Sequence, residues 1–147
     1  MAKFNNRNQS HRNGKQEHEK INLEKINLNY KENQGLFGDV AEKWSKHLNY
    51  ESNNTVNKST QIRSFYDKVL ELNEKAQRVK DDEQYIKEVF PFVVMLKSKV
   101  AYAKTRGLVS QTFVTMINQC VEDANTIEKM QNFKYFFEAV IGFYPKK

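Results

Sequence analysis

The chain has 147 residues, enough for one ordinary domain, and carries 24 Lys and Arg against 18 Asp and Glu, a net charge of +6. This positive excess favours an anionic partner such as RNA, DNA or an acidic protein face. A single cysteine, Cys120, excludes an internal disulfide, and the longest apolar run, residues 89–96, is too short to span a bilayer.

Residues 1–38 differ from the rest of the chain, because Asn, Gln, Lys and Glu separate only a few apolar side chains. Such a composition buries too little apolar surface to offset the entropy of ordering, so we predict a flexible polar tail over 1–38, with Met1–Glu19 disordered. The start of the chain has no apolar core of a signal peptide, so we expect a cytoplasmic protein without membrane contact. Four aliphatic side chains are candidates for docking on the domain: Ile21, Leu23, Ile26 and Leu28.

Residues 39–147 are predicted to form an all-α domain, a compact bundle of about five helices. Asp39 and Glu42 have the spacing of a capping box, and the first helix is predicted to run from there to about Leu48. A second helix is predicted over 60–78. Its inward stripe consists of Ile62, Phe65, Tyr66, Val69, Asn73 and Ala76.

A third helical pattern extends over 81–106 with Pro91 inside it. Because proline lacks an N–H donor and clashes with the preceding turn, Pro91 either kinks this helix or starts a new one after Phe90. Gly107 is expected to end the pattern. The predicted inward positions are Ile86, Val89, Val93, Leu96, Val100 and Ala103.

The fourth and fifth helices are predicted over 110–124 and 127–144. The fifth is apolar on two nearly opposite faces, the second of which includes Phe136 and Phe143. A helix that is apolar all round is either central in its bundle or part of an interface. Both interpretations stay open, and Phe136 and Phe143 are the residues predicted for contact with other copies of the chain.

The sequence offers little for catalysis. None of His11, His18 and His47 has a cysteine or carboxylate at metal-site spacing. There is no glycine-rich phosphate loop and no nucleophile elbow, and Cys120 falls on an inward stripe. We therefore predict that the protein is not an enzyme and has no metal site and no cofactor.

The charge pattern of the third and fourth helices is more informative. No acid lies between Glu88 and Glu122. The cations of this stretch occupy two flanks of the apolar stripe: Lys97 and Lys104 on one, Lys99 and Arg106 on the other.

Tyr102 lies four residues before Arg106, so the two side chains share a helix surface. A cationic strip with an aromatic ring suits a nucleic-acid backbone, because phosphates meet positive charge and a base can stack. The alternative is a solvated face whose lysine stems cover apolar flanks. Arg63 borders the stripe of the second helix and is either a further phosphate contact or an anchor to an acid within the protein.

Three segments of the predicted helices share their pattern with a known family: KSTQIRSFY at 58–66, LKSKVAYAKTR at 96–106 and FKYFFEAVIGFY at 133–144. Together they resemble the small subunit of type III-A CRISPR effector complexes, the Csm small-subunit family. Trp44 fits its short first helix, and the match covers about Asp39–Tyr144. Gly142 and Phe143 depart from the family pattern, and these differences affect packing more than binding.

The resemblance implies a non-catalytic subunit that stacks in several copies along the guide-bound backbone of an RNA-guided antiviral complex. Its implied partners are target RNA, guide RNA, the backbone and large subunits, and other copies of itself. Matched to the family motifs, the implied RNA contacts are Arg63, Lys97, Lys99 and Arg106, with Lys104 and Tyr102 as second choices. The alternative function is a helical protein–protein adaptor without direct nucleic-acid contact.

Overall fold

The computed structural model describes residues 23–145, and this range contains six α-helices, one π-helical turn and no strand. The elements are η1 (Leu36–Val40), α2 (Ala41–Tyr50), α3 (Ser59–Ala76), α4 (Asp82–Glu88), α5 (Phe90–Thr105), α6 (Gln111–Asp123) and α7 (Ile127–Phe143). The all-α prediction is confirmed, with one helix more than expected. Within the same range no helix has the length and apolar character needed to cross a membrane.

The additional helix comes from Pro91. Of the two possibilities, the structure has a new helix, and Pro91 lies in the first turn of α5, where a missing N–H costs nothing. The preceding helix α4 is short, and its N-cap is Asp81, whose Oδ1 accepts a hydrogen bond from the backbone N–H of Gln84 at 2.9 Å.

The break also changes which face of α4 is buried. Ile86, predicted to point inward, is 41% exposed, whereas Tyr85 is fully buried. The inward stripe of α5 does not continue into α4, because the two helices no longer share one axis and one 3.6-residue repeat. The Tyr85 hydroxyl donates a hydrogen bond of 2.6 Å to the carbonyl oxygen of Ala124, and burial raises the pKa of this phenol.

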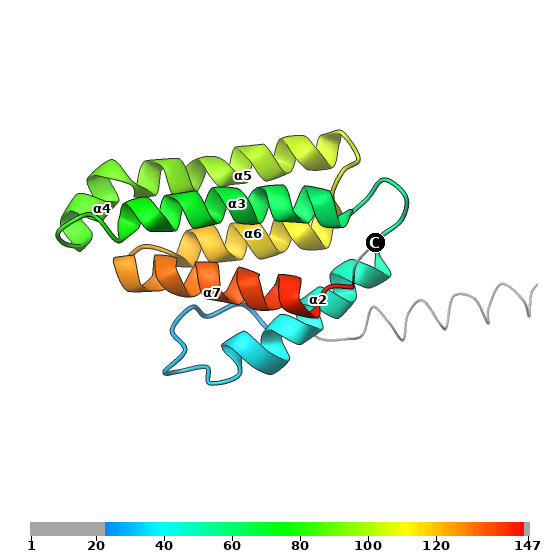
Figure 1. Ribbon diagram of the computed structural model, residues 1–147, viewed down its shortest axis with the longest axis horizontal. Coiled ribbons are helices and arrows are strands. Elements are labelled where there is room, and N and C mark those ends of the chain that lie inside the picture. Colours follow the sequence, from blue (N-terminus) through cyan, green and yellow to red (C-terminus); the bar gives the residue numbers. More distant parts are fainter. Residues whose placement is uncertain (1–22, 146–147) are drawn as a thin grey trace, which may run out of the picture.

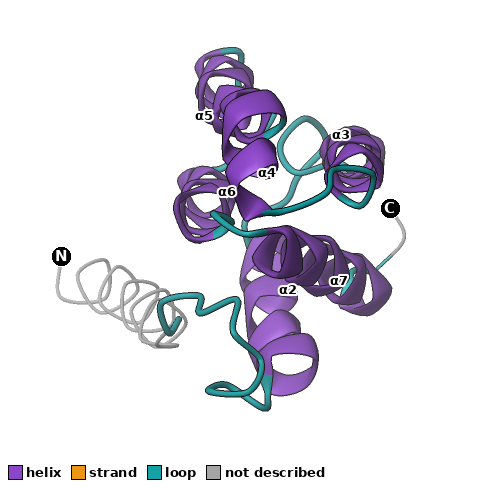
Figure 2. Cartoon of the chain, turned by 90° about the vertical axis from the view of Figure 1, so that its left-hand side faces the viewer, coloured by secondary structure: helices purple, strands orange, loops and turns teal. Residues whose placement is uncertain are grey.

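Helix α7 is the centre of the bundle. It packs against α2, α3, α6 and η1, while α5 packs on α6 (Figure 1 and Figure 2). Of the two interpretations of the fifth predicted helix, the central position is therefore confirmed. Phe136 is fully buried within its own chain, since helices cover α7 on several sides, and it offers no surface to a second copy. Phe143, the other predicted interface residue, is 44% exposed.

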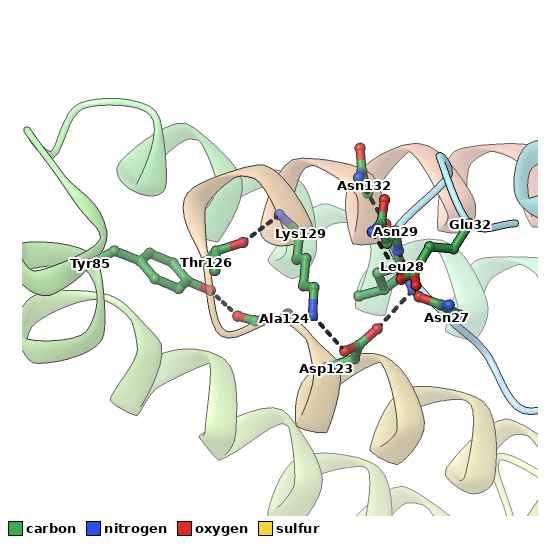
Figure 3. A network of polar contacts seen from close by, with 10 residues as sticks. All are labelled: Asn27, Leu28, Asn29, Glu32, Tyr85, Asp123, Ala124, Thr126, Lys129 and Asn132. Atoms are coloured by element: carbon green, nitrogen blue, oxygen red, sulfur yellow. Dashed lines mark hydrogen bonds and ion pairs between the residues drawn. The ribbon is translucent and has the colours of Figure 1, made fainter.

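The segment before η1 is attached to the bundle through its backbone. The N–H of Ile26 donates to Gln119 Oε1 at 2.9 Å, and the N–H of Leu28 donates to Asp123 Oδ2 at 2.7 Å. The Asn132 amide in turn donates to the carbonyl oxygen of Leu28 at 2.8 Å (Figure 3). Ile26 and Leu28 are buried, so this part of the predicted tail is docked and the packed region begins upstream of residue 38. The prediction for Met1–Glu19 lies outside the described residues.

The capping box predicted at Asp39 and Glu42 is wrong. Asp39 lies inside η1, which leads directly into α2, and Val40 at the start of α2 already has helical dihedral angles (φ −65°, ψ −49°). A helix that continues from a preceding turn has its first N–H groups satisfied by that turn, so a side-chain cap is not needed.

Gly107 ends α5 with φ +73°, the left-handed conformation that glycine adopts without strain. The N–H of Gly107 donates to Lys104 O and that of Leu108 to Ala103 O, as in a Schellman motif. We expect Gly107→Ala to lower the free energy of unfolding by about 1 kcal/mol, because an L residue is strained there. Urea denaturation measures the effect. The matched control is Gly142→Ala, in helical surroundings with no atom near its added Cβ, which we expect to be neutral or stabilising.

Candidate nucleic-acid interface

A groove separates α3 and α5, which lie side by side and run in opposite directions (Figure 1). One half is a cleft of about 350 Å³, lined among others by Gln61, Lys68, Lys99, Tyr102 and Arg106. The other half is a cleft of about 190 Å³, lined among others by Lys68, Leu72, Lys75, Phe92, Met95 and Lys99. Lys68 and Lys99 line both clefts, so the two clefts adjoin. We call the first half the basic end and the second half the apolar end.

The basic end combines three cations with an exposed aromatic ring. Lys99 and Tyr102 on α5 and Arg106, its C-cap residue, follow one another at i, i+3 and i+7, so the helix and its end place them on one face. Tyr102 is 63% exposed, and the Arg106 guanidinium lies 5.8 Å from the centroid of its ring. Across the groove, α3 contributes Lys68.

These cations are available to an external anion. No carboxylate lines the basic end, and within residues 23–145 neither Lys68, Lys99 nor Arg106 forms an ion pair. At the apolar end the lining includes Glu71, whose carboxylate lies 3.8 Å from Lys75 Nζ. The positive potential of the basic end is therefore not neutralised by the protein.

The structure has the two cationic flanks that were predicted for α5. They point to different sides, so the predicted RNA contacts do not form one surface. Lys97 lies on the flank that faces α6, where its Nζ is 2.9 Å from Glu122 Oε1. Lys104 is seven residues later on the same flank and is exposed. The Lys97–Glu122 pair is itself largely exposed, so it contributes at most about 1 kcal/mol and exchanges readily for another anion.

Arg63 lies away from the groove. It follows Gln61, a groove residue, by two positions, which corresponds to about 200° around the axis of α3. Its side chain is exposed and forms no ion pair within residues 23–145, so the anchor to an internal acid considered for it is not observed. Of the six predicted residues, the structure brings together Lys99, Tyr102 and Arg106.

Lys68 is the cation of the basic end that the sequence-based assignment of RNA contacts omitted. Its place beside the apolar stripe of α3 is visible in the sequence, five residues after Arg63 and on the opposite flank. Which flank of α3 faces α5 depends on how the helices pack, and no pattern within α3 contains that information.

The remaining reactive side chains do not form a second site. Cys120 is fully buried, and its burial, together with the charge of Asp123, raises the pKa of the thiol. His47 lies 3.7 Å from Glu51 one helical turn away. Within residues 23–145 no group of three or more His, Cys, Asp and Glu side chains is placed to hold a metal ion, and His11 and His18 lie outside that range.

The fold and the groove define a class of small helical-bundle proteins with a cationic groove between two of their helices. Comparison with protein families places the chain more narrowly. It matches the family Csm2 Type III-A over residues 31–146, most of its length, and therefore belongs to that family. The protein is a structural small subunit of the type III-A CRISPR-Cas Csm complex, and the resemblance seen in its three helical motifs is confirmed. No curated protein and no solved structure gave a significant match.

Proposed function

We propose that this Csm subunit holds guide or target RNA in the basic end of the α3–α5 groove. The observation that carries the proposal is an acid-free cleft in which Lys68, Lys99 and Arg106 surround the exposed ring of Tyr102. Several copies stack along the guide-bound backbone subunit, beside the large subunit, in a cytoplasmic antiviral complex. Each copy then adds one basic end to a continuous track for RNA.

The geometry supports recognition of the RNA backbone. The three cations neutralise phosphates and release their counterions, while Tyr102 offers a face on which a base stacks. Lys68, Lys99 and Tyr102 project from helices and Arg106 from the C-cap of α5, so most of the surface that the strand meets is rigid. Base identity is left to pairing between guide and target, as in other RNA-guided complexes. Lys97, Lys104 and Arg63 contribute at most outer contacts, because they lie on other flanks of α5 and α3.

We further propose that the subunit is not catalytic. The described lining of the basic end contains Lys, Arg, Tyr, Gln and Ser side chains, with no histidine or carboxylate to act as a general base or metal ligand. Strand cleavage then belongs to the backbone and large subunits. This subunit orders the RNA on which they act.

Ultraviolet crosslinking in the assembled complex tests the RNA contact. We expect crosslinked nucleotides on the peptide that contains Tyr102, because a stacked ring is close to a base. The crosslink should decrease as salt is raised, since the contact depends on phosphate neutralisation. RNA crosslinks confined to other subunits, with none on α3 or α5, would contradict the proposal.

The second candidate function is an adaptor that contacts proteins alone. The observation in its favour is the apolar end of the groove, where Phe92 and Met95 are exposed. The adaptor function predicts that a neighbouring protein covers the basic end of the groove in the complex. The same crosslinking experiment separates the two functions, because an adaptor yields protein crosslinks and no RNA crosslinks from Tyr102.

A further inference from the structure

The apolar end of the α3–α5 groove has a different chemistry from the basic end. Phe92 is 56% exposed and Met95 is 48% exposed, and both line the cleft together with the more deeply placed Leu72 and Leu96. Large apolar side chains that gather in a cleft with a polar rim mark an interaction surface more often than chance exposure. RNA binding at the basic end does not account for them.

The size and rim of this cleft indicate what would fill it. Its volume of about 190 Å³ exceeds the roughly 150 Å³ that accommodates a benzene-sized group, so it admits one large apolar side chain. Lys68, Lys75 and Lys99 stand around it, and Glu71 is already paired with Lys75. The occupant therefore combines an apolar anchor with negative charge beside it.

A protein segment meets both conditions better than RNA does. Phosphate and ribose are polar, so a strand lying here would satisfy the lysines and leave the exposed side chains of Phe92 and Met95 without an apolar partner. A second copy that met this cleft through its own groove would bring lysines against lysines, so that arrangement is disfavoured. An acidic peptide segment supplies an apolar side chain and carboxylates at once.

We propose that the apolar end of the groove docks an acidic segment of another subunit of the Csm complex, with one aromatic or large aliphatic side chain seated between Phe92 and Met95. The lysines of the rim pair with carboxylates on either side of that anchor. The groove then has two occupants, protein at the apolar end and RNA at the basic end. This docking does not depend on the proposed RNA contact.

Photocrosslinking identifies the occupant. The complex is reconstituted from its purified subunits and guide RNA with p-benzoylphenylalanine in place of Phe92. We expect a crosslink to another subunit, at an apolar residue that has Asp or Glu within a few positions. The matched control carries the same group in place of Val94, which is 41% exposed on α5 and does not line the groove. Crosslinks from position 92 to RNA or to a second copy of this chain would overturn the proposal. So would a yield of subunit crosslinks from position 92 no higher than that from position 94.

Variants measure the contribution of the docking site to assembly. We expect Phe92→Ala combined with Met95→Ala to reduce incorporation into the complex about tenfold, the loss typical of interface anchors. Val94→Ala should incorporate normally. Because the changed side chains are exposed, circular dichroism should report an unchanged fold. Wild-type incorporation of the double variant would overturn the docking site, whether or not the Tyr102–RNA crosslink is kept.

Discussion

A chain with Lys68→Ala, Lys99→Ala and Arg106→Ala is expected to bind single-stranded RNA about a hundredfold more weakly than the wild type at 0.1 M salt. On a single strand each lost phosphate contact removes about 0.7 from the slope of log affinity against log salt, so three lost contacts reduce the slope by about 2. Filter binding over a salt series measures both quantities. The three side chains are exposed and form no ion pair within the described residues, so the fold should be unaffected.

A charge-matched control separates local contact from the general effect of net charge. Lys43→Ala, Lys46→Ala and Lys80→Ala also remove three exposed cations, two of them on α2, which lies across the bundle from α5 (Figure 2). We expect this variant to lose only a few-fold in affinity, since screening weakens charges more than about 10 Å from the strand. Equal losses in the two variants would mean that RNA is attracted by net charge and not held in the groove.

A third variant, with Arg63, Lys97 and Lys104 changed to alanine, tests the other predicted contacts. These residues lie on the flanks away from the groove, and Lys97 is paired with Glu122. We expect an affinity between those of the groove variant and the control. A loss as large as that of the groove variant would show that the RNA path crosses the outer faces of α5 and α3.

Local patterns in the sequence predicted most of the helices because, apart from the central α7, the helices of this bundle bury one face each. The α5 stripe through Val93, Leu96 and Val100 is buried as its 3.6-residue spacing requires. The errors occur where a contact outside the helix decides the structure. Ile86 fits the extended stripe, but the helix breaks between α4 and α5, just before Pro91, and in α4 it is Tyr85 that points inward and reaches Ala124.

The docked segment before η1 shows another limit of sequence patterns. Its composition is that of a polar tail, and its order depends on acceptors and donors far along the chain, such as Asp123 for Leu28 N–H. Composition measures how much apolar surface a segment carries, and it contains no information on a matching surface about a hundred residues away. Only the apolar character of Ile26 and Leu28 indicated that docking was possible.

The candidate site was predictable on α5 alone. The absence of acids and the i, i+3, i+7 spacing of Lys99, Tyr102 and Arg106 are local properties of one helix. The groove itself, with Lys68 opposite these residues, exists only because α3 and α5 are neighbours. The same holds for the apolar end, since Leu72 and Met95 are distant in sequence and share one cleft.

Asn57 connects the ends of four helices at one end of the bundle. It is fully buried, in the left-handed conformation with φ +57°, which asparagine tolerates better than most residues. Its amide nitrogen donates to Leu48 O in the last turn of α2 and to the Oγ of Ser110, which caps α6. Its amide oxygen accepts from Ser110 N–H, and its own N–H donates to Leu108 O beyond α5. The Tyr144 hydroxyl at the end of α7 donates to its carbonyl oxygen.

Asn57→Ala is expected to lower the free energy of unfolding by about 3 to 4 kcal/mol. Three side-chain hydrogen bonds worth about 1 kcal/mol each are lost, and an alanine at φ +57° adds about 1 kcal/mol of strain. The melting temperature should fall by about 10 °C, measured by thermal denaturation together with urea titration. Asn57→Gly separates the two causes, because glycine removes the same hydrogen bonds without strain, and its loss should be smaller by about 1 kcal/mol. Both variants could instead keep a free energy of unfolding within about 1 kcal/mol of the wild type. In that case the side-chain amide of Asn57 would not hold these helix ends together, and its backbone hydrogen bonds to Leu108 and Tyr144 would be enough to do so.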